Sequence, residues 1–134
     1  MRRIVGAILK NEGLDPQSCE LTIVFSTDGE LQQLNETYRH ISGATDVLSF
    51  PADDLDPESG RKYLGDIVIS MDQVNKQHQK YGDQKIDIVS LLIVHGILHL
   101  LGLDHATSAE KEVMWRKQAQ ILEKFGVVVH IDDD

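Results

Sequence analysis

The sequence predicts one α+β domain in which a small mixed β-sheet packs against a layer of helices. Three observations lead to this prediction. The chain has 134 residues, 41% of them apolar, which suits a single domain over residues 1–134. Alternation of apolar and polar residues marks short strands, and apolar residues at helical spacing mark the segments around them. No internal repeat, low-complexity tract or linker divides the chain.

The first half of the chain is expected to alternate helices with strands. A weakly amphipathic segment at residues 2–12 predicts a helix that ends at Gly13. Asp28 stands at the N-cap position of a second helix. Pro51 is expected to stop a strand, and an acidic loop follows it. The three expected strands cover residues 20–26, 46–50 and 63–70.

The second half is expected to be helical. A short polar helix is predicted at residues 72–80 and a long helix at residues 83–101. The long helix is apolar nearly all round, which predicts burial at the centre of the domain. Residues 107–110 read Thr-Ser-Ala-Glu, a capping box that opens the last helix. Trp115 is expected to pack in the core beside the apolar face of that helix, which consists of Met114, Ile121, Leu122 and Phe125. A role for Trp115 in stacking on RNA is the alternative.

The charge balance limits the partners of the protein. With 13 basic and 22 acidic residues the net charge is −9, which disfavours a general nucleic-acid binder, since phosphate contacts need Lys and Arg. Much of the acid is peripheral, in a loop at residues 53–58 and in a tail at residues 132–134. A local basic groove is therefore compatible with the sequence. The cations that would form an RNA track are Arg61, Lys62, Lys76, Lys80 and Lys85.

The sequence also predicts a cytoplasmic protein. Its single cysteine, Cys19, cannot form an internal disulfide, which fits a reducing compartment. The apolar stretch near the N-terminus is too short for a secretory signal. The apolar run at residues 88–103 falls short of a membrane span. We therefore expect no membrane contact.

The segment from His95 to His105 carries the strongest functional signal. His95 and His99 are four residues apart, so on a helix their imidazoles project from one face and can reach a single ion. Gly102 can adopt the left-handed conformation that ends a helix, which would bring His105 to the same ion. Three imidazoles without an obvious fourth protein ligand describe a catalytic zinc site with a position open for water. Burying three imidazoles without a shared partner would be costly.

The histidine spacing is also that of the metzincin metalloproteases. The residue after His95 is Gly96, however, where a peptidase carries a Glu general base. The sequence therefore predicts a zincin-like scaffold that performs a different hydrolysis. A small metalloprotease that recruits its base from elsewhere stays open as an alternative. A closed structural site is a further alternative, and it would need a fourth ligand such as His78 or His130.

Three carboxylates are candidates for orienting the histidines. Histidines that bind a metal usually donate their other ring N–H to a carboxylate or a carbonyl. Asp46 and Asp66 lie next to apolar strand residues, and Asp104 directly precedes His105. The alternative role of these carboxylates is to cap turns or helix ends.

The segment from His95 to His105 resembles the signature of the YbeY-type endoribonucleases, the bacterial rRNA maturation factors. Three earlier stretches agree with that resemblance and come in the family's order. Two positions depart from the family pattern, with Ser42 in place of its usual Asp and Ala44 in place of its usual Pro. The family also usually begins with a strand before its first helix. The agreeing stretches are LNETYR at residues 34–39, TDVLSFP at residues 45–51 and LGDIVIS at residues 64–70.

The resemblance implies a zinc-dependent, single-strand-specific endoribonuclease that matures the 3′ end of small-subunit rRNA and takes part in ribosome quality control. It implies one Zn²⁺ held by His95, His99 and His105. It also implies a catalytic role for Arg39, which we expect to clamp the scissile phosphate. The implied partners are RNA, the small ribosomal subunit and a ribosome-assembly GTPase, with no DNA. A non-catalytic, zinc-containing ribosome assembly factor stays open as an alternative.

Overall fold

The order of the elements follows the sequence prediction of helix, strand, helix, two strands and three helices. The computed structural model describes residues 2–39, 45–103 and 106–130. A short 3₁₀ turn, which was not predicted, precedes the first strand. In chain order the elements are α1 (Arg2–Asn11), η1 (Pro16–Ser18), β1 (Cys19–Ser26), α2 (Asp28–Arg39), β2 (Val47–Leu55), β3 (Lys62–Ser70), α3 (Met71–Tyr81), α4 (Lys85–Leu100) and α5 (Ser108–Lys124).

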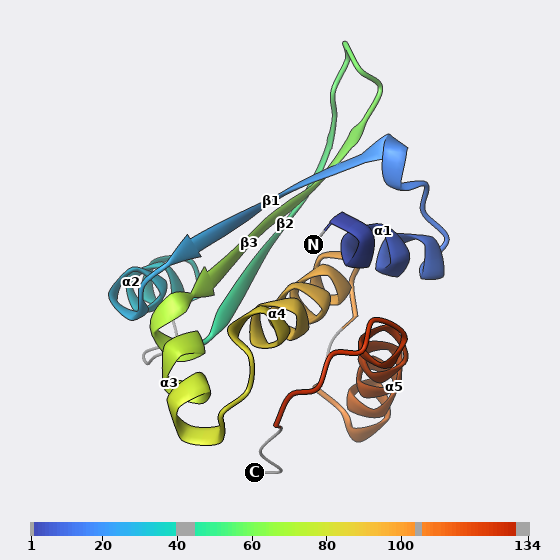
Figure 1. Ribbon diagram of the computed structural model, residues 1–134. Helices are drawn as coiled ribbons and strands as arrows, with labels where there is room; N and C mark the ends of the chain where they lie inside the picture. The colour runs from blue at the N-terminus through green and yellow to red at the C-terminus, as the bar shows by residue number, and fades with distance from the viewer. Residues whose placement is uncertain (1, 40–44, 104–105, 131–134) are drawn as a thin grey trace.

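The sheet is mixed, as predicted, and has three strands in the order β1-β3-β2. The central strand β3 pairs in parallel with β1 and antiparallel with β2. The β2–β3 hairpin extends beyond the helices (Figure 1). The prediction that Pro51 stops its strand is wrong, because β2 continues to Leu55. Pro51 lies on an edge strand opposite Gly65, next to a register shift, so its missing N–H interrupts little pairing.

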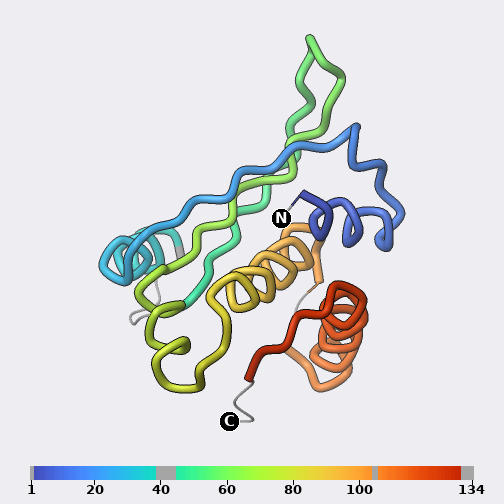
Figure 2. The backbone as a smooth tube through the Cα atoms, in the orientation of Figure 1, coloured from blue at the N-terminus to red at the C-terminus, as the bar shows by residue number. Residues whose placement is uncertain are grey.

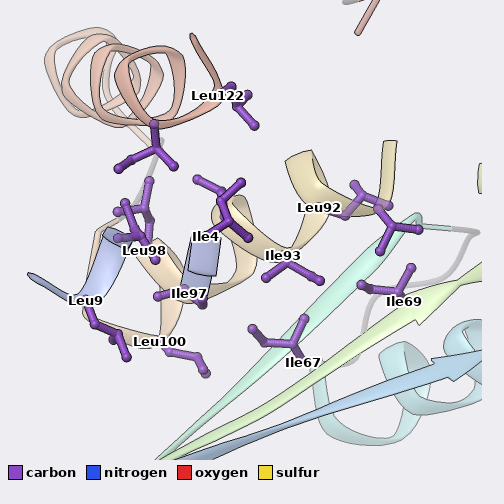
Figure 3. Packing of buried hydrophobic residues seen from close by; sticks show 14 of the residues in the cluster. Ile4, Leu9, Ile67, Ile69, Leu92, Ile93, Ile97, Leu98, Leu100 and Leu122 are labelled. Atoms are coloured by element: carbon purple, nitrogen blue, oxygen red, sulfur yellow. The ribbon is translucent and has the colours of Figure 1, made fainter. Parts of the chain in front are cut away.

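Helix α4 lies between the sheet and two other helices. It contacts β2 and β3 on one side and α1 and α5 on the other (Figure 1). Most of its side chains are buried, in agreement with the all-round apolar pattern. Ile67 and Ile69 of β3 belong to the same core cluster as Ile93 and Ile97 of α4 (Figure 3). No helix in the described part of the chain, α4 included, is both long and apolar enough to cross a membrane.

A second, smaller cluster holds α2 on the sheet. Val68 alternates with Ile67 and Ile69 along β3, so it faces away from α4. Its partner across the strands is Leu48 of β2, and both pack against Leu31 of α2. Helices therefore cover both faces of this small sheet, with α4 on one face and α2 on the other.

Helix α2 begins differently from the prediction. Thr27, and not Asp28, caps it, because the Thr27 hydroxyl accepts a hydrogen bond from the Glu30 N–H at 3.3 Å. Asp28 instead accepts hydrogen bonds from Ser70 Oγ at 2.6 Å and from Gln73 Nε2 at 3.0 Å. These bonds, that from Ser70 first, lower the pKa of the Asp28 carboxyl. Asp28 thus joins the start of α2 to the start of α3.

The N-cap predicted for the last helix is present at Thr107. The Thr107 hydroxyl accepts a hydrogen bond from the Glu110 N–H at 3.1 Å. Helix α5 then presents the predicted apolar face, on which Met114, Ile121 and Leu122 are buried. This face packs α5 against α4.

Candidate metal centre and adjoining cleft

His95 and His99 lie one turn apart on α4 with their imidazoles together. The two Nε2 atoms are 3.0 Å apart, and the ring centroids are 4.6 Å apart at an interplanar angle of 72°. Both side chains are half-buried on a helix whose other faces are covered. The helix thus directs two imidazole nitrogens at one point near the surface of the domain.

Gln118 of α5 fixes the orientation of His95. Its Oε1 atom accepts a hydrogen bond from His95 Nδ1 at 2.6 Å, and the Gln118 residue is only 4% exposed. With the proton on Nδ1, a neutral His95 presents the lone pair of Nε2 to the shared point. Sequence reasoning missed Gln118. The available signal was a polar residue within the apolar face that includes Met114 and Ile121, on the same side of the helix.

The donor set fits a zinc ion. Two imidazole nitrogens bound tetrahedrally to Zn²⁺ at ~2.0–2.1 Å lie about 3.3 Å apart, close to the observed separation. A hydrogen bond from the opposite ring nitrogen, as His95 makes, is the usual support for such a ligand. Gly102 has φ +95°, and the Leu103 N–H donates to Leu98 O at 3.0 Å, so the chain reverses directly after α4 as predicted. His105, the predicted third ligand, lies outside the described residues.

Gly96 lies where α4 passes closest to the sheet. A Cβ atom placed on it would be 2.8 Å from Ile67 Cγ2, closer than such atoms normally approach. On the neighbouring strand, Ser49 Oγ donates to the Gly96 carbonyl at 3.2 Å. A glutamate at position 96, which a metzincin peptidase needs as its general base, would therefore collide with β3.

A cleft opens beside His95. It has a volume of about 440 Å³ and lies among α3, α4, α5 and the start of β2. The carboxylate of Asp46, one of the predicted orienting groups, lines it together with Gln118. Trp115 also lines the cleft and is half-buried. The prediction that Trp115 packs in the core is therefore wrong: it is Met114, the preceding residue, that belongs to the core cluster.

His130, in the segment after α5, lines this cleft. This segment runs toward the turn between α3 and α4 (Figure 2), where the His130 N–H donates to Asp83 Oδ2 at 2.9 Å. The His130 ring stacks on Tyr81, with centroids 4.5 Å apart and an interplanar angle of 10°. The bond from the His130 N–H, followed by that from Gln77, lowers the pKa of Asp83.

The other predicted site residues fall in several places. Arg39 is the last residue of α2, and its side chain lies outside the described part of the structure. Asp104, Ser42 and Ala44 are outside the described residues as well. Asp66 accepts a hydrogen bond from the Tyr63 hydroxyl, which raises the pKa of Tyr63.

The two histidines considered as a fourth ligand make other contacts. His78 Nδ1 is 2.7 Å from the Asp83 carbonyl oxygen. His130 stacks on Tyr81. Within residues 2–39, 45–103 and 106–130, no three metal-binding side chains form a cluster.

The predicted cationic track is divided by the fold. Arg61 and Lys62 lie at the end of the β2–β3 hairpin and pair with Glu20 at 3.1 Å and Asp53 at 3.0 Å. Lys76 of α3 lies 3.5 Å from Asp28. Lys80 lies over the Tyr81 ring, 4.9 Å from its centroid, beside the cleft. The β2–β3 hairpin, which carries Arg61 and Lys62, extends away from α3, which carries Lys76 and Lys80 (Figure 1). Binding of RNA by these cations stays a prediction.

Comparison with known proteins agrees with the sequence motifs. Residues 1–126 match the family model described as Endoribonuclease YbeY. Endoribonuclease YbeY of Desulforamulus reducens is 39% identical over 92% of this chain and 83% of its own. Endoribonuclease YbeY of Pelotomaculum thermopropionicum is 37% identical over 91% of this chain and 82% of its own. The fold matches the solution structure of TM1509 from Thermotoga maritima with a TM-score of 0.57, at 22% identity over 93% of this chain and 81% of that one. The chain therefore belongs to the YbeY endoribonuclease family.

Proposed function

We propose that this protein is a zinc-dependent endoribonuclease that cleaves single-stranded RNA in the maturation of the 3′ end of small-subunit rRNA. Membership of the YbeY endoribonuclease family supports the reaction class. The observation that carries the proposal in this chain is the approach of His95 Nε2 to His99 Nε2 at 3.0 Å, with Gln118 holding His95 in place.

The histidines would hold the ion in a zincin-like arrangement. His95 and His99 would supply two ligands from one helix face, and His105 would be the third. When bound, the ion supplies Lewis-acid activation of water and of the phosphodiester. A side-chain base at position 96 is then dispensable, which fits the glycine found there.

Arg39 would bind the scissile phosphate. A guanidinium can hold two phosphate oxygens through paired N–H donors and neutralise charge that develops on them in the transition state. The role of Arg39 is thus electrostatic and separate from holding the ion. Substituting Arg39→Ala is expected to slow RNA cleavage while zinc stays bound. Unchanged cleavage by that variant would exclude Arg39 from the reaction.

The competing functions make different demands on the site. A peptidase needs a general base, and Gly96 lies against β3 where a Glu side chain would collide with Ile67. A non-catalytic zinc protein needs a fourth protein ligand, whereas the described contacts of His78 and His130 are with Asp83 and Tyr81. Both observations favour the nuclease.

The test compares three proteins on a labelled single-stranded RNA that contains the 3′ region of small-subunit rRNA. The wild type is expected to cut the RNA, to stop after chelation and to recover when zinc is added. His99→Ala is expected not to cut. His78→Asn, which removes an imidazole elsewhere, is the matched control and is expected to cut like the wild type. Equal cutting by His99→Ala would overturn the proposal, as would RNA left intact by the wild type with zinc.

The proposal extends to the cellular setting. A cytoplasmic protein that matures rRNA meets its substrate in small ribosomal subunits, and an assembly GTPase is the expected second partner. Co-sedimentation of the protein with purified small subunits tests the first contact. Absence from the subunit fraction at low salt would count against it, because contacts to phosphate are strongest there.

A further inference from the structure

The cleft beside His95 has an aromatic wall that the cleavage chemistry does not use. Trp115 of α5 lines it from one side, and the stacked rings of Tyr81 and His130 line it from another. Leu91 and Leu92 of α4 contribute apolar surface. A concave, mostly apolar site with a few polar groups is typical of a pocket for a flat organic molecule, and about 440 Å³ is sufficient for one.

We propose that this cleft is a subsite for one unpaired nucleobase of the RNA, stacked on Trp115 next to the phosphodiester at the metal centre. The inference deepens the proposed endoribonuclease function and rests on it. His95 belongs both to the cleft and to the metal centre, so a base seated there is connected directly to the reacting phosphate. Bases in single-stranded RNA are free to stack on aromatic side chains, whereas paired bases are not.

The charges at the cleft fit a nucleotide better than a peptide or a lipid tail. Lys111 lines the cleft, and Lys80 lies 4.9 Å above the Tyr81 ring. Both cations are exposed and add positive charge near the cleft. Asp46 also lines the cleft, and its carboxylate would offer acceptor atoms to the N–H groups on the edge of a base.

The aromatic wall is held in shape before any ligand binds. Asp83 Oδ2 accepts hydrogen bonds from the His130 N–H at 2.9 Å and from Gln77 Nε2 at 3.2 Å, and Gln77 Nε2 also donates to the His130 carbonyl at 3.1 Å. These bonds fix the C-terminal segment beside Tyr81. A preformed wall reduces the entropy lost when a base stacks.

The chain itself contains the reporter for this subsite. Trp115 is the only tryptophan, so all tryptophan emission comes from the cleft. A short single-stranded oligoribonucleotide is expected to quench this emission. The matched probe is the same oligonucleotide made abasic, which keeps the phosphates and removes the bases. It is expected to quench far less and to bind about 5- to 150-fold more weakly, the effect of losing one stacked base.

Variants at the same position provide the second test. Trp115→Leu is expected to raise KM for RNA by about 5- to 150-fold, much more than it lowers kcat, and Trp115→Phe to restore most of the binding. Val113→Ala, at an exposed position of the same helix, is the control and should match the wild type. Equal affinity for intact and abasic RNA, or an unchanged KM for Trp115→Leu, would overturn the subsite. So would quenching by an unfolded peptide as strong as that by RNA.

The two proposals fail in different ways. If intact RNA quenches Trp115 and abasic RNA does not, the subsite is supported even when no cleavage occurs, and only the nuclease function falls. If the protein cleaves RNA and His99→Ala does not, while abasic and intact RNA bind with equal affinity, the subsite is excluded and the nuclease function stands.

Discussion

Gly96 shows how one residue serves both the packing and the chemistry of the site. Its missing side chain lets α4 approach Ile67 of β3, and its carbonyl oxygen accepts a hydrogen bond from the Ser49 hydroxyl of β2. The neighbouring His95 therefore keeps a fixed height above the sheet. A larger residue at position 96 would move the helix that carries both histidines.

Substituting Gly96→Ala is expected to destabilise the protein by about 1 kcal/mol. Alanine gains ~1 kcal/mol of helix propensity over glycine, but overpacking a tight contact costs ~1–3 kcal/mol. Urea unfolding followed by circular dichroism measures the difference. The double variant Gly96→Ala/Ile67→Val should recover part of the loss, because valine removes a methyl group next to the new Cβ. A fully stable Gly96→Ala would show that the sheet yields easily there.

Gln118 is expected to control metal affinity without touching the ion. Replacing it as Gln118→Leu keeps the approximate volume but removes the acceptor for His95 Nδ1. Losing such a supporting bond typically weakens metal binding by ~10–100-fold. Competition with a chromophoric chelator gives the affinity. Gln120→Leu, at an exposed position of the same helix, is the control. Wild-type affinity in Gln118→Leu would reduce Gln118 to a packing role.

At the scale of elements, Asp28 connects two helices that are distant in sequence. Its carboxylate accepts from Ser70 and Gln73 at the start of α3, and its own backbone N–H donates to Asp72 Oδ2 at 2.9 Å. The Asp28 carboxylate lies near the N-termini of α2 and α3, where the positive end of a helix dipole stabilises a negative charge. The β1–α2 and β3–α3 connections are thereby held side by side.

This connection is expected to depend on pH. The folded state lowers the pKa of Asp28, so its contribution to stability is fully present above the ordinary carboxyl pKa and is lost as the pH falls below about 4. Thermal unfolding should therefore show that Asp28→Asn has a Tm several degrees below the wild type at neutral pH. The gap should narrow toward pH 3. A Tm difference between the two proteins that is constant with pH would mean that the charge of Asp28 contributes nothing to stability.

Whole elements were predictable where the signal is local. The N-cap at Thr107, the left-handed conformation of Gly102 and the burial of α4 each follow from neighbouring residues, and the structure confirms each of them. The strand through Pro51 was not predictable in the same way. Whether a proline is tolerated there depends on β2 being at the edge of the sheet, which the pairing with β3 alone decides.

The same distinction between local signals and long-range contacts applies to the candidate site. The spacing of His95 and His99 on one helix is enough to bring their nitrogens together. Gln118 and Trp115 reach the site only because α5 packs against α4, and His130 only because the chain returns past Tyr81. Contacts between distant segments are invisible to periodicity, so the sequence predicted the approach of His95 to His99 and missed the cleft beside them.

For the whole molecule, metal binding is expected to raise stability. An ion that binds only the folded chain stabilises it by ~2.7 kcal/mol at a free concentration of 100 Kd, which corresponds to a Tm increase of about 5–10 °C for a domain of this size. Differential scanning fluorimetry with and without zinc measures the shift. His99→Ala should lose most of it, and His78→Asn should keep it. An equal shift in all three proteins would place the ion elsewhere.

Pro51 also affects how molecules meet one another. An edge strand exposes unpaired N–H and C=O groups along which a second chain can add, the first step toward aggregation. On β2 this row is broken by a proline that has no N–H, by the register shift after it and by the carboxylates of Asp53 and Asp54. The irregular half of β2 thus disfavours addition of a second chain at this edge of the sheet, while the regular half of the strand packs against the helix that carries the histidines.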